Sequence, residues 1–394
     1  MNLNLSPDQR RALEKIRMWF HSADCMWPFL LLGAAGTGKT CVAQAIPAAI
    51  GASNPLYLAP TGKAAQRLRS VGCIPAMTIH TALNGRPRTD MCPATCKQCD
   101  REKNTPCGRT LRFDFSEEVL PHDLVIVDEA SMVGKRLGTA LAARCAALIA
   151  IGDPAQLSPI DDDPYFRPEH CADTFELTTI HRQAEGGPVL EVATAARQGK
   201  PLPLVGRSGV IGIHVPIETL LAQDWVPDVI LTGRRDTRWQ IVRAVRRAQG
   251  KPVDYPVPGD VLMVQKNDKR GTRDPLFNGQ QVRVTDVLCS CRSCTPATCS
   301  SEELVIDAFD EDDRPVRRVF DRLGFAENTE TTPKGNRSIT FTEAVTVHKA
   351  QGSEWDTVLI IDESKIFGAG WLYTAVTRAR EQVVIMPRQT ETGV

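Results

Sequence analysis

One octet constrains this chain more than any other feature. It is GAAGTGKT, Gly33–Thr40, and it follows directly on the apolar run Phe29–Leu32. The run is suited to a buried parallel strand, and the octet matches the pattern G-x-x-x-x-G-K-[ST] in full. In that pattern glycines let backbone N–H groups close around phosphate oxygens, the lysine neutralises phosphate charge, and the last hydroxyl holds Mg²⁺. We therefore predict a nucleotide site built from Gly33, Gly36, Gly38, Lys39 and Thr40.

A second element weakens the alternative that the octet is a glycine-rich turn that binds nothing. The apolar stretch Val125–Val127 ends in Asp128 and Glu129. Asp128, at the strand end, is placed to reach the Mg²⁺ shell, and Glu129 to polarise an attacking water. Two phosphate-site elements in one chain predict an NTPase. Pro47 is expected to kink the helix that follows the octet or to end it early.

Composition sets the limits of the remaining interpretation. At 394 residues the chain fits two or three domains, and its 47 basic and 47 acidic residues cancel, so a polyanion site has to be a local patch. The N-terminus carries charges where a signal peptide needs an apolar run, and the longest uncharged stretch, Cys41–Gly62, contains three prolines. We expect a cytoplasmic protein with no membrane helix. Its thirteen cysteines then argue against a disulfide framework.

Further motifs indicate what the NTPase drives. Ile149–Ile160, IAIGDPAQLSPI, is a third apolar strand that ends in polar side chains, among them Gln156. Downstream segments carry Arg182 and Arg378, more than a hundred residues beyond the octet. An arginine that arrives from a second domain can stabilise charge on the γ-phosphate and couple hydrolysis to domain closure.

In their order along the chain, these motifs resemble those of superfamily 1B helicases of the RecD/Dda branch, which move 5′ to 3′ on single-stranded DNA. The match runs nearly end to end. Leu5–Gln9 resembles the Q motif, which implies an adenine contact for Gln9; GDPAQL implies that Gln156 senses the γ-phosphate. Arg182 and Arg378 fall on the arginine fingers. The segment TVHKAQGSEW resembles motif V, where the nucleotide contacts would be Gly352 and Glu354.

The resemblance also implies a nucleic-acid track. Tyr57–Leu68 resembles motif Ia and Thr78–Leu83 the motif after it, whereas Leu231–Gln240 departs from its family pattern because Asp236 replaces an asparagine. Any one of the histidines could instead be a satisfied core or capping residue. The implied nucleic-acid contacts are Thr61, Lys63, Thr78, His80, Arg238 and His348.

The expected fold is α/β, with two RecA-like parallel-sheet motor domains, ATP in the cleft between them, and single-stranded DNA on the opposite rim. Small domains would interrupt both: a cysteine-rich domain 1B with a pin or wedge, by family analogy, and a β-barrel-like domain 2B. The expected bounds are 1–83 and 113–175 for motor domain 1A, 84–112 for 1B, 176–258 and 341–394 for motor domain 2A, and 259–340 for 2B.

A local basic patch offsets the zero net charge. The stretch Thr232–Lys251 holds seven basic residues against one acid, Asp236. Ile241, Val245 and Ala248 fall at helical spacing, so we expect them to face the core and the arginines to be displayed. A phosphate-contacting helix and a plain solvated face are about equally favoured.

Eight cysteines form two groups of four, one in each expected insertion, with the spacings C-x3-C-x2-C-x7-C and C-x-C-x2-C-x4-C. Four-thiolate zinc sites would replace the core that such short polar segments cannot build. An iron–sulfur cluster is the competing chemistry, and one shared site is a further alternative. The first group is expected to stiffen the wedge. The predicted ligands are Cys92, Cys96, Cys99, Cys107, Cys289, Cys291, Cys294 and Cys299.

The leading prediction is therefore an ATP- and Mg²⁺-dependent DNA helicase for replication, recombination or repair, of phage or plasmid type. Its expected partners are single-stranded and forked DNA, with single-strand-binding protein or replisome components as further candidates. The alternatives are an RNA helicase, because no motif reads a 2′-hydroxyl, and a loading factor whose ATPase is a switch that unwinds nothing.

Overall fold

The computed structural model describes most of the chain, as two compact units. The first is Met1–Pro60, Ala65–Pro154 and Ser158–Ile180; the second is Thr61–Ala64, Ala155–Leu157 and His181–Val394. The described residues are 5–90, 110–159, 162–181, 187–206, 208–210, 226–265, 276, 279–291, 295–298, 302–310, 313–326 and 339–387.

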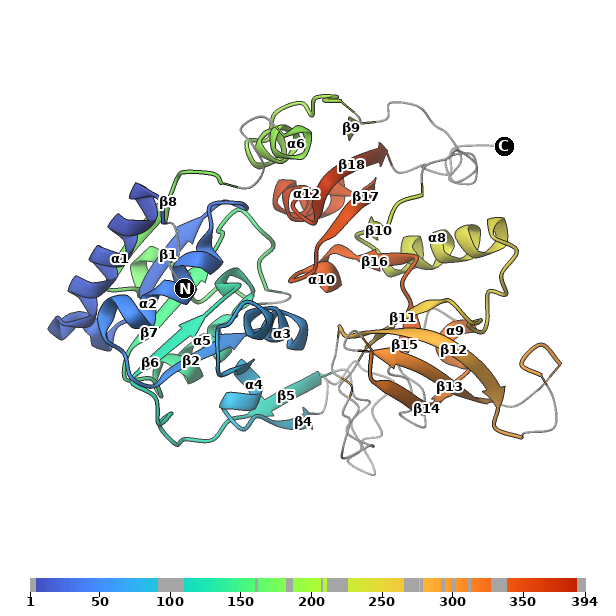
Figure 1. Cartoon of the computed structure of the whole chain (residues 1–394), viewed down its shortest axis with the longest axis horizontal. Coiled ribbons are helices and arrows are strands. Elements are labelled where there is room, and N and C mark those ends of the chain that lie inside the picture. Colours follow the sequence, from blue (N-terminus) through green and yellow to red (C-terminus); the bar gives the residue numbers. More distant parts are fainter. Residues whose placement is uncertain are drawn as a thin grey trace. The chain divides into compact units, whose positions relative to one another are not determined.

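The first unit is built on a six-stranded parallel sheet with the order β3-β2-β6-β7-β1-β8 (Figure 1). Its central strands are short apolar runs without polar alternation, because helices cover both faces. The strands are β1 (Phe29–Gly33), β2 (Pro55–Ala59), β3 (Ala76–Thr78), β6 (Leu124–Val127), β7 (Leu148–Gly152) and β8 (Asp173–Leu177).

Helices of this unit begin where the sequence supplies caps. Ser6 caps the first helix in a reciprocal capping box with Gln9. The helices are α1 (Pro7–Phe20), η1 (Ala23–Met26), α2 (Lys39–Ile50), α3 (Gly62–Ser70), α4 (Ile79–Ala82), η2 (Ala130–Met132), α5 (Lys135–Ala142) and η3 (Pro168–His170); the first residues of α3 cluster with the second unit.

The expectation that Pro47 would end α2 early is wrong. The helix continues to Ile50, with Pro47 inside it. Proline denies a hydrogen bond to the carbonyl four residues earlier, here Ala43. That carbonyl accepts the Tyr57 hydroxyl from β2 at 3.2 Å instead, and the apolar face of the helix stays buried.

A two-stranded antiparallel sheet begins the first expected insertion. It pairs β4 (Arg86–Asp90) with β5 (Thr110–Asp114), in a register that puts Arg86 opposite Asp114. Residues 91–109 lie outside the described part of the chain, so the four predicted ligands of this insertion, Cys92, Cys96, Cys99 and Cys107, lie outside it too.

The second unit contains a five-stranded parallel sheet with the order β16-β10-β17-β18-β9. Its strands are β9 (Gly209–Val210), β10 (Val229–Thr232), β16 (Ala344–Thr346), β17 (Trp355–Asp362) and β18 (Ala379–Pro387). The helices of this part are α6 (Pro188–Arg197), α8 (Arg235–Ala248), α10 (Val347–Ala350), α11 (Ser364–Phe367) and α12 (Ala369–Val376).

A second five-stranded sheet in the same unit is antiparallel, with the order β14-β13-β12-β11-β15 (Figure 1). Along β13 every second residue is buried, as expected for a sheet with one face on a core. Its elements are β11 (Val261–Val264), β12 (Gln281–Cys289), β13 (Glu303–Asp310), β14 (Pro315–Asp321), β15 (Ile339–Phe341) and α9 (Leu323–Ala326).

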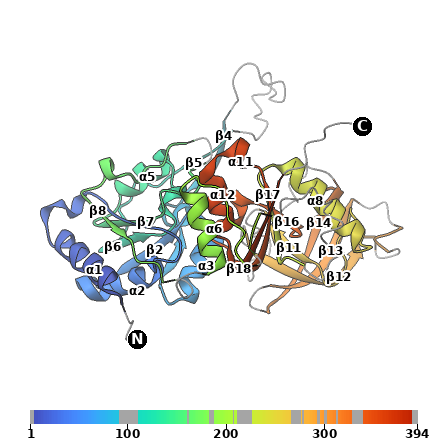
Figure 2. The ribbon, with the colours of Figure 1, turned by 90° about the horizontal axis from the view of Figure 1, so that it is seen from above.

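Helix α8 joins the two sheets of the second unit (Figure 2). Trp239, Val242 and Val245 belong to a core that also takes residues from both sheets. The expectation that all arginines of this helix are displayed is wrong, because Arg246 is wholly buried. The expected core face also differs: Ile241 is half-buried, and Ala248 is exposed.

No helix within the described ranges is long and apolar enough to cross a membrane.

Candidate nucleotide-binding site and nucleic-acid contacts

The loop between β1 and α2 has room for backbone and little else. A Cβ atom on Gly33 would lie 2.5 Å from the Thr37 hydroxyl oxygen, so a side chain at this position would collide with the loop. Gly36 and Gly38 have positive φ angles of 85° and 76°, which side chains adopt at a cost. The glycines therefore let the chain curl into a cradle of backbone N–H groups.

Helix α2 starts inside this cradle. Its N-cap, Gly38, offers no side chain, so no side-chain acceptor caps the first turn. The Lys39 ammonium donates to the carbonyl oxygens of Gly33 at 2.8 Å and Ala34 at 2.9 Å, which folds the lysine back over the loop. Thr40, the predicted Mg²⁺ ligand, is the next residue and is half-buried.

The carboxylates of Asp128 and Glu129 follow β6. Burial and the neighbouring Glu129 raise the pKa of Asp128 to about 6, while the nearby cations Lys39 and Arg67 oppose the shift. The influence of Lys39 on Asp128 shows that the two predicted phosphate-site elements lie close together. Glu129 itself has a φ angle of 52°, a strained conformation for a residue with a side chain and one that concentrates at functional sites.

These residues fit a nucleotide with Mg²⁺. A Cβ on Gly33 would fill the cradle. Lys39 and Asp128 border it, and these are a cation for phosphate and a carboxylate for Mg²⁺. Just after Glu129, the buried Ser131 hydroxyl has no hydrogen-bond partner among the described residues. A buried hydroxyl without a partner is costly, and a ligand would relieve that cost.

Gln9 lies at the cradle, but its polar atoms are engaged. It is 5% exposed; its amide donates to the Thr37 carbonyl at 3.2 Å, and its amide oxygen accepts from the Ser6 N–H at 3.0 Å. An adenine contact at Gln9 would therefore replace or share these bonds.

Asp8, a residue that sequence reasoning missed, connects α1 to the segment after β8. Its carboxylate accepts from the N–H groups of Thr178 at 2.8 Å and Thr179 at 3.2 Å. Although burial opposes ionisation, these bonds and the Arg11 guanidinium lower the pKa of Asp8. Its position beside Gln9 was the available signal. The predicted arginine finger Arg182, further along the segment, lies outside the described residues.

In the second unit, the motif residues meet around Arg378. Arg378 is 3% exposed, and its guanidinium donates to the side-chain oxygen of Gln156 at 3.4 Å. Gln156 belongs to the second unit although its neighbours in sequence, up to Pro154 and from Ser158, belong to the first. Next to it, Ser353 Oγ and Gln351 Nε2 are buried and lack hydrogen-bond partners in the described structure. Gly352 between them has a φ angle of 79°.

Glu354, the other predicted motif V contact, is placed differently. Its carboxylate forms an ion pair with the Arg380 guanidinium at 3.6 Å. A nucleotide contact at Glu354 would compete with that pair.

Two of the four predicted nucleic-acid contacts before residue 81, Thr61 and Thr78, form hydrogen bonds with nearby backbone N–H groups. Thr61 Oγ1 accepts from the Ala64 N–H, and Thr78 Oγ1 caps α4 by accepting from the Thr81 N–H. Lys63 lies over the Trp355 ring, 5.8 Å from its centroid. Burial lowers the pKa of His80, whose ring packs beside Phe115.

The two predicted contacts of the second unit differ in availability. Arg238 ties α8 to the strands beside it, by donating to the Ala344 and Phe341 carbonyl oxygens, each at 2.9 Å. His348 remains half-buried beside the ring of Phe367, and burial lowers its pKa. At neutral pH His348 is therefore an uncharged, aromatic contact candidate.

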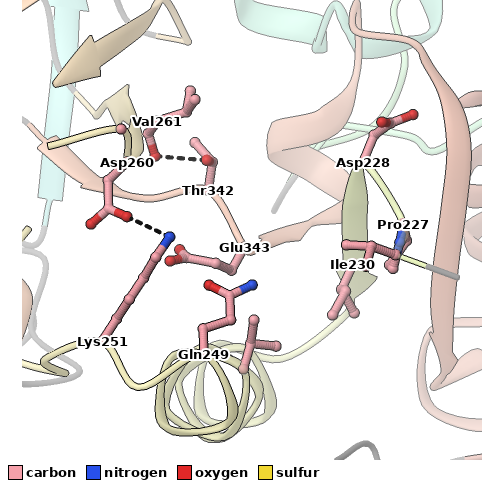
Figure 3. A pocket seen from close by; sticks show the side chains of 12 residues that line it. Pro227, Asp228, Ile230, Gln249, Lys251, Asp260, Val261, Thr342 and Glu343 are labelled. Atoms are coloured by element: carbon pink, nitrogen blue, oxygen red, sulfur yellow. Dashed lines mark hydrogen bonds and ion pairs between the residues drawn. The ribbon is translucent and has the colours of Figure 1, made fainter. Parts of the chain in front are cut away.

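One cavity of the second unit lies apart from the predicted contacts. It measures about 210 Å³ and lies where the end of α8 meets β10 and β11 (Figure 3). Lys251 and Asp260 form an ion pair at its wall, at 2.9 Å. No residue predicted to bind nucleotide or nucleic acid lines this cavity.

For the second cysteine group, the structure gives two of four positions. Cys289 is buried at the end of β12, and Cys291 is exposed in the turn that follows; Cys294 and Cys299 lie outside the described residues. Within the described part of the chain, no group of three or more His, Cys, Asp or Glu side chains is placed to hold a metal ion.

Comparisons with known proteins agree with this geometry. Residues 4–210 match the AAA domain family, and residues 341–386 match the UvrD-like helicase C-terminal domain. The chain is 28% identical to the ATP-dependent RecD2 DNA helicase of Deinococcus radiodurans over 388 residues, which cover 90% of this chain and 46% of that protein. It is 26% identical to the RecBCD enzyme subunit RecD of Mycobacterium tuberculosis, over 91% of this chain and 66% of that protein.

The fold is similar to that of Pif1 helicase structures. The Bacteroides Pif1 complex with ADP-AlF3 and single-stranded DNA aligns with a TM-score of 0.58 and 18% identity, covering 98% of this chain and 92% of that one. Candida albicans Pif1 aligns with a TM-score of 0.53 and 17% identity, covering 98% and 94%. The predicted α/β fold with two RecA-like parallel sheets is confirmed. The chain spans about half the length of the RecD2 relative. It belongs to the AAA-domain family, and its similarity to the RecD helicase relatives runs over nine-tenths of its length.

Proposed function

We propose that this chain is an ATP-dependent DNA helicase that moves 5′ to 3′ on single-stranded DNA and unwinds duplexes. The observation that carries the proposal is the nucleotide cradle, where Lys39 and Asp128 lie within electrostatic reach and Glu129 is held in a strained conformation. A relative named as a DNA helicase, which aligns over nine-tenths of this chain, supports the substrate. The direction rests on the resemblance to the RecD and Pif1 branch.

Each side chain of the cradle has a stated role in the proposal. Lys39 turns from the loop carbonyls to the β- and γ-phosphates, while Thr40 and Asp128 hold Mg²⁺, which supplies charge neutralisation at the phosphates. Glu129 orients the attacking water. Arg378 acts as an arginine finger and Gln156 as its sensing partner, since the two already share a hydrogen bond.

The test uses two forked DNA substrates of opposite tail polarity, with ATP and Mg²⁺. Wild-type protein is expected to open only the fork with a 5′ loading tail, and Lys39→Ala to open neither. A 3′-tailed product would refute the direction. If neither fork opens while single-stranded DNA still stimulates hydrolysis, the chain is a nucleic-acid-dependent switch; stronger stimulation by RNA than by DNA would identify an RNA helicase.

Two finer assignments belong to the same proposal. We infer that residues 84–112 and 259–340 are the inserted domains 1B and 2B of the family. Within them, the cysteine groups bind zinc. For the second group, the connection between β12 and β13 is longer than an ordinary hairpin loop, and it contains every predicted ligand of this group after Cys289. A bound metal would replace the core that this connection lacks.

Metal content measured on the full, undenatured chain tests the zinc assignment. Two zinc ions per chain are expected, with one lost in Cys96→Ser and one in Cys294→Ser. One ion lost completely in both variants would indicate a shared site, and iron with inorganic sulfide would overturn zinc. Because the first group is expected to stiffen the wedge, Cys96→Ser should depress unwinding much more than DNA-stimulated hydrolysis; equal loss of both would indicate a plain folding role.

A further inference from the structure

Three neighbouring parallel strands of the second unit end at one edge. The order β16-β10-β17 brings together the segments that follow them: α10 with His348, the start of α8, and α11. Carboxyl edges of parallel sheets are where α/β proteins bind ligands. Of these segments, only α10 and α8 carried predicted contacts.

Helix α11 adds an aromatic ring to this edge. Phe367 is 36% exposed; one side of its ring is stacked on the buried Trp371 at a centroid distance of 6.0 Å, and His348 packs against it at 6.4 Å. The ring also occupies the space of a side chain on Gly233, where a Cβ would lie 2.3 Å from it. Trp371, His348 and Gly233 therefore hold the Phe367 side chain in place, and part of that side chain is open to solvent.

A buried carboxylate fixes the backbone next to this ring. Glu363 is 1% exposed and accepts from the N–H groups of Gly233 at 2.7 Å and Arg234 at 2.8 Å. Its other oxygen accepts from the Thr237 hydroxyl at 2.8 Å. The amides of Gly233 and Arg234, which precede the first residue of α8, are thus already satisfied.

The charges around the ring favour a polyanion. Within the described segments 233–238 and 363–368, Arg234, Arg235 and Lys365 are exposed, against one exposed carboxylate, Asp236, which lies 3.8 Å from Arg234. An aromatic face beside cations is the combination that binds single-stranded nucleic acid, because every base has a π-face and every nucleotide a phosphate. Two exposed apolar side chains, Ile366 and Phe367, make too small a patch for a stable protein interface.

We infer that Phe367 is a base-stacking residue for single-stranded DNA in the second unit. The inference rests on the proposed function and adds a contact to it that no motif of the chain indicates. The stacked base lies on the exposed part of the ring, His348 borders it, and the cations of α8 and α11 contact the flanking phosphates. Stacking is insensitive to sequence, as a translocating enzyme requires.

The test compares four variants by fluorescence anisotropy with a labelled oligo-dT strand: Phe367→Ala, Phe367→Leu, Phe367→Tyr and the control Ile366→Ala. Phe367→Ala and Phe367→Leu are expected to raise Kd by about five- to 150-fold, the range of one lost stacked base. Phe367→Tyr should stay close to wild type. Ile366→Ala removes a more exposed apolar side chain, without a ring, and should change little.

Two further measurements separate stacking from packing. One abasic position, scanned along the strand, should weaken wild-type binding at one site and leave Phe367→Leu unaffected there, because the partner of the base is already gone. The slope of log Kd against log salt should not change in Phe367→Leu, whereas Arg235→Ala should reduce it by about one phosphate contact.

The outcomes distinguish this inference from the function on which it rests. If wild type binds no single-stranded DNA, the proposed function fails. The stacking role is refuted, while the helicase proposal stands, if wild type binds and the Kd of Phe367→Leu equals that of Ile366→Ala. The same holds if an abasic position weakens binding by wild type and by Phe367→Leu equally at every place in the strand.

Discussion

Replacement of Arg246 by alanine should destabilise the second unit strongly. The guanidinium is completely buried; it forms an ion pair with Asp260 at 2.8 Å and donates to Glu343 at 2.6 Å. It also lies over the Phe341 ring at 3.9 Å. Arg246→Ala would leave Asp260 with Lys251 and the Val257 N–H as partners. It would leave Glu343 with neither oxygen paired, because its second oxygen already lacks a partner in the described structure.

The magnitude follows from the state of those two carboxylates. Removing one member of a buried ion pair costs about 3–5 kcal/mol, because the other charge stays buried. For a domain of roughly 150–250 residues, each kcal/mol lowers Tm by about 2–4 °C, so the transition of this unit should fall by about 6–20 °C. The exposed neighbour Arg247 is the matched control, and Arg247→Ala should change stability by no more than about 0.5 kcal/mol.

Differential scanning calorimetry of the full chain measures both variants, and anisotropy with labelled DNA measures their binding. Adding Glu343→Gln to Arg246→Ala should recover part of the loss, since one buried charge is then gone. Equal transition temperatures for Arg246→Ala and Arg247→Ala would refute the reasoning. Normal stability with weakened DNA binding would mean that Arg246 is displayed, as the basic-patch hypothesis had it.

Three shorter predictions concern the first unit. The pKa of Asp128 is about 6 in the fold, against 3.8 ordinarily, so its ionisation lowers the stability of the fold as pH rises between these values. Asp128→Asn should abolish ATP hydrolysis in the presence of Mg²⁺. In chemical denaturation at pH 8 without Mg²⁺, the same variant should be more stable than wild type, by up to about 3 kcal/mol. Asp8→Ala should cost about 1–3 kcal/mol at neutral pH, and the difference should shrink below pH 3.8, where the lowered pKa of Asp8 no longer favours the fold. Gly33→Ala forces the loop off Thr37 and should abolish binding of a fluorescent ATP analogue with a smaller loss of Tm.

The strands and the cradle were the predictable parts of this molecule. Phe29–Leu32 and Val125–Val127 are apolar without alternation, which signals burial on both faces, and both form central strands of the first sheet. The octet predicted its own geometry because its glycines are needed for positive φ angles and close approach. These signals are local, so a single sequence contains them.

Long-range partners were not predictable. Pro47 stays helical because Tyr57, from the next strand, satisfies the freed carbonyl. Arg246 is buried because Asp260 and Glu343 neutralise it, and neither lies within α8. In both cases the deciding residue is distant in sequence, and nothing in the helix itself reveals it.

The two helices that start at strand ends in the two units illustrate how one backbone geometry serves two purposes. Helix α2 starts after Gly38, which leaves the first-turn amides without a side-chain acceptor, and the positive end of the helix dipole then favours an anion. Helix α8 starts after Arg234, where the buried Glu363 already accepts from two amides. Because Glu363 occupies the amides of Gly233 and Arg234 in a nearly dry site, those two amides are not available to a ligand, and the exposed ring of Phe367 beside Gly233 is the contact that remains at this point of the edge.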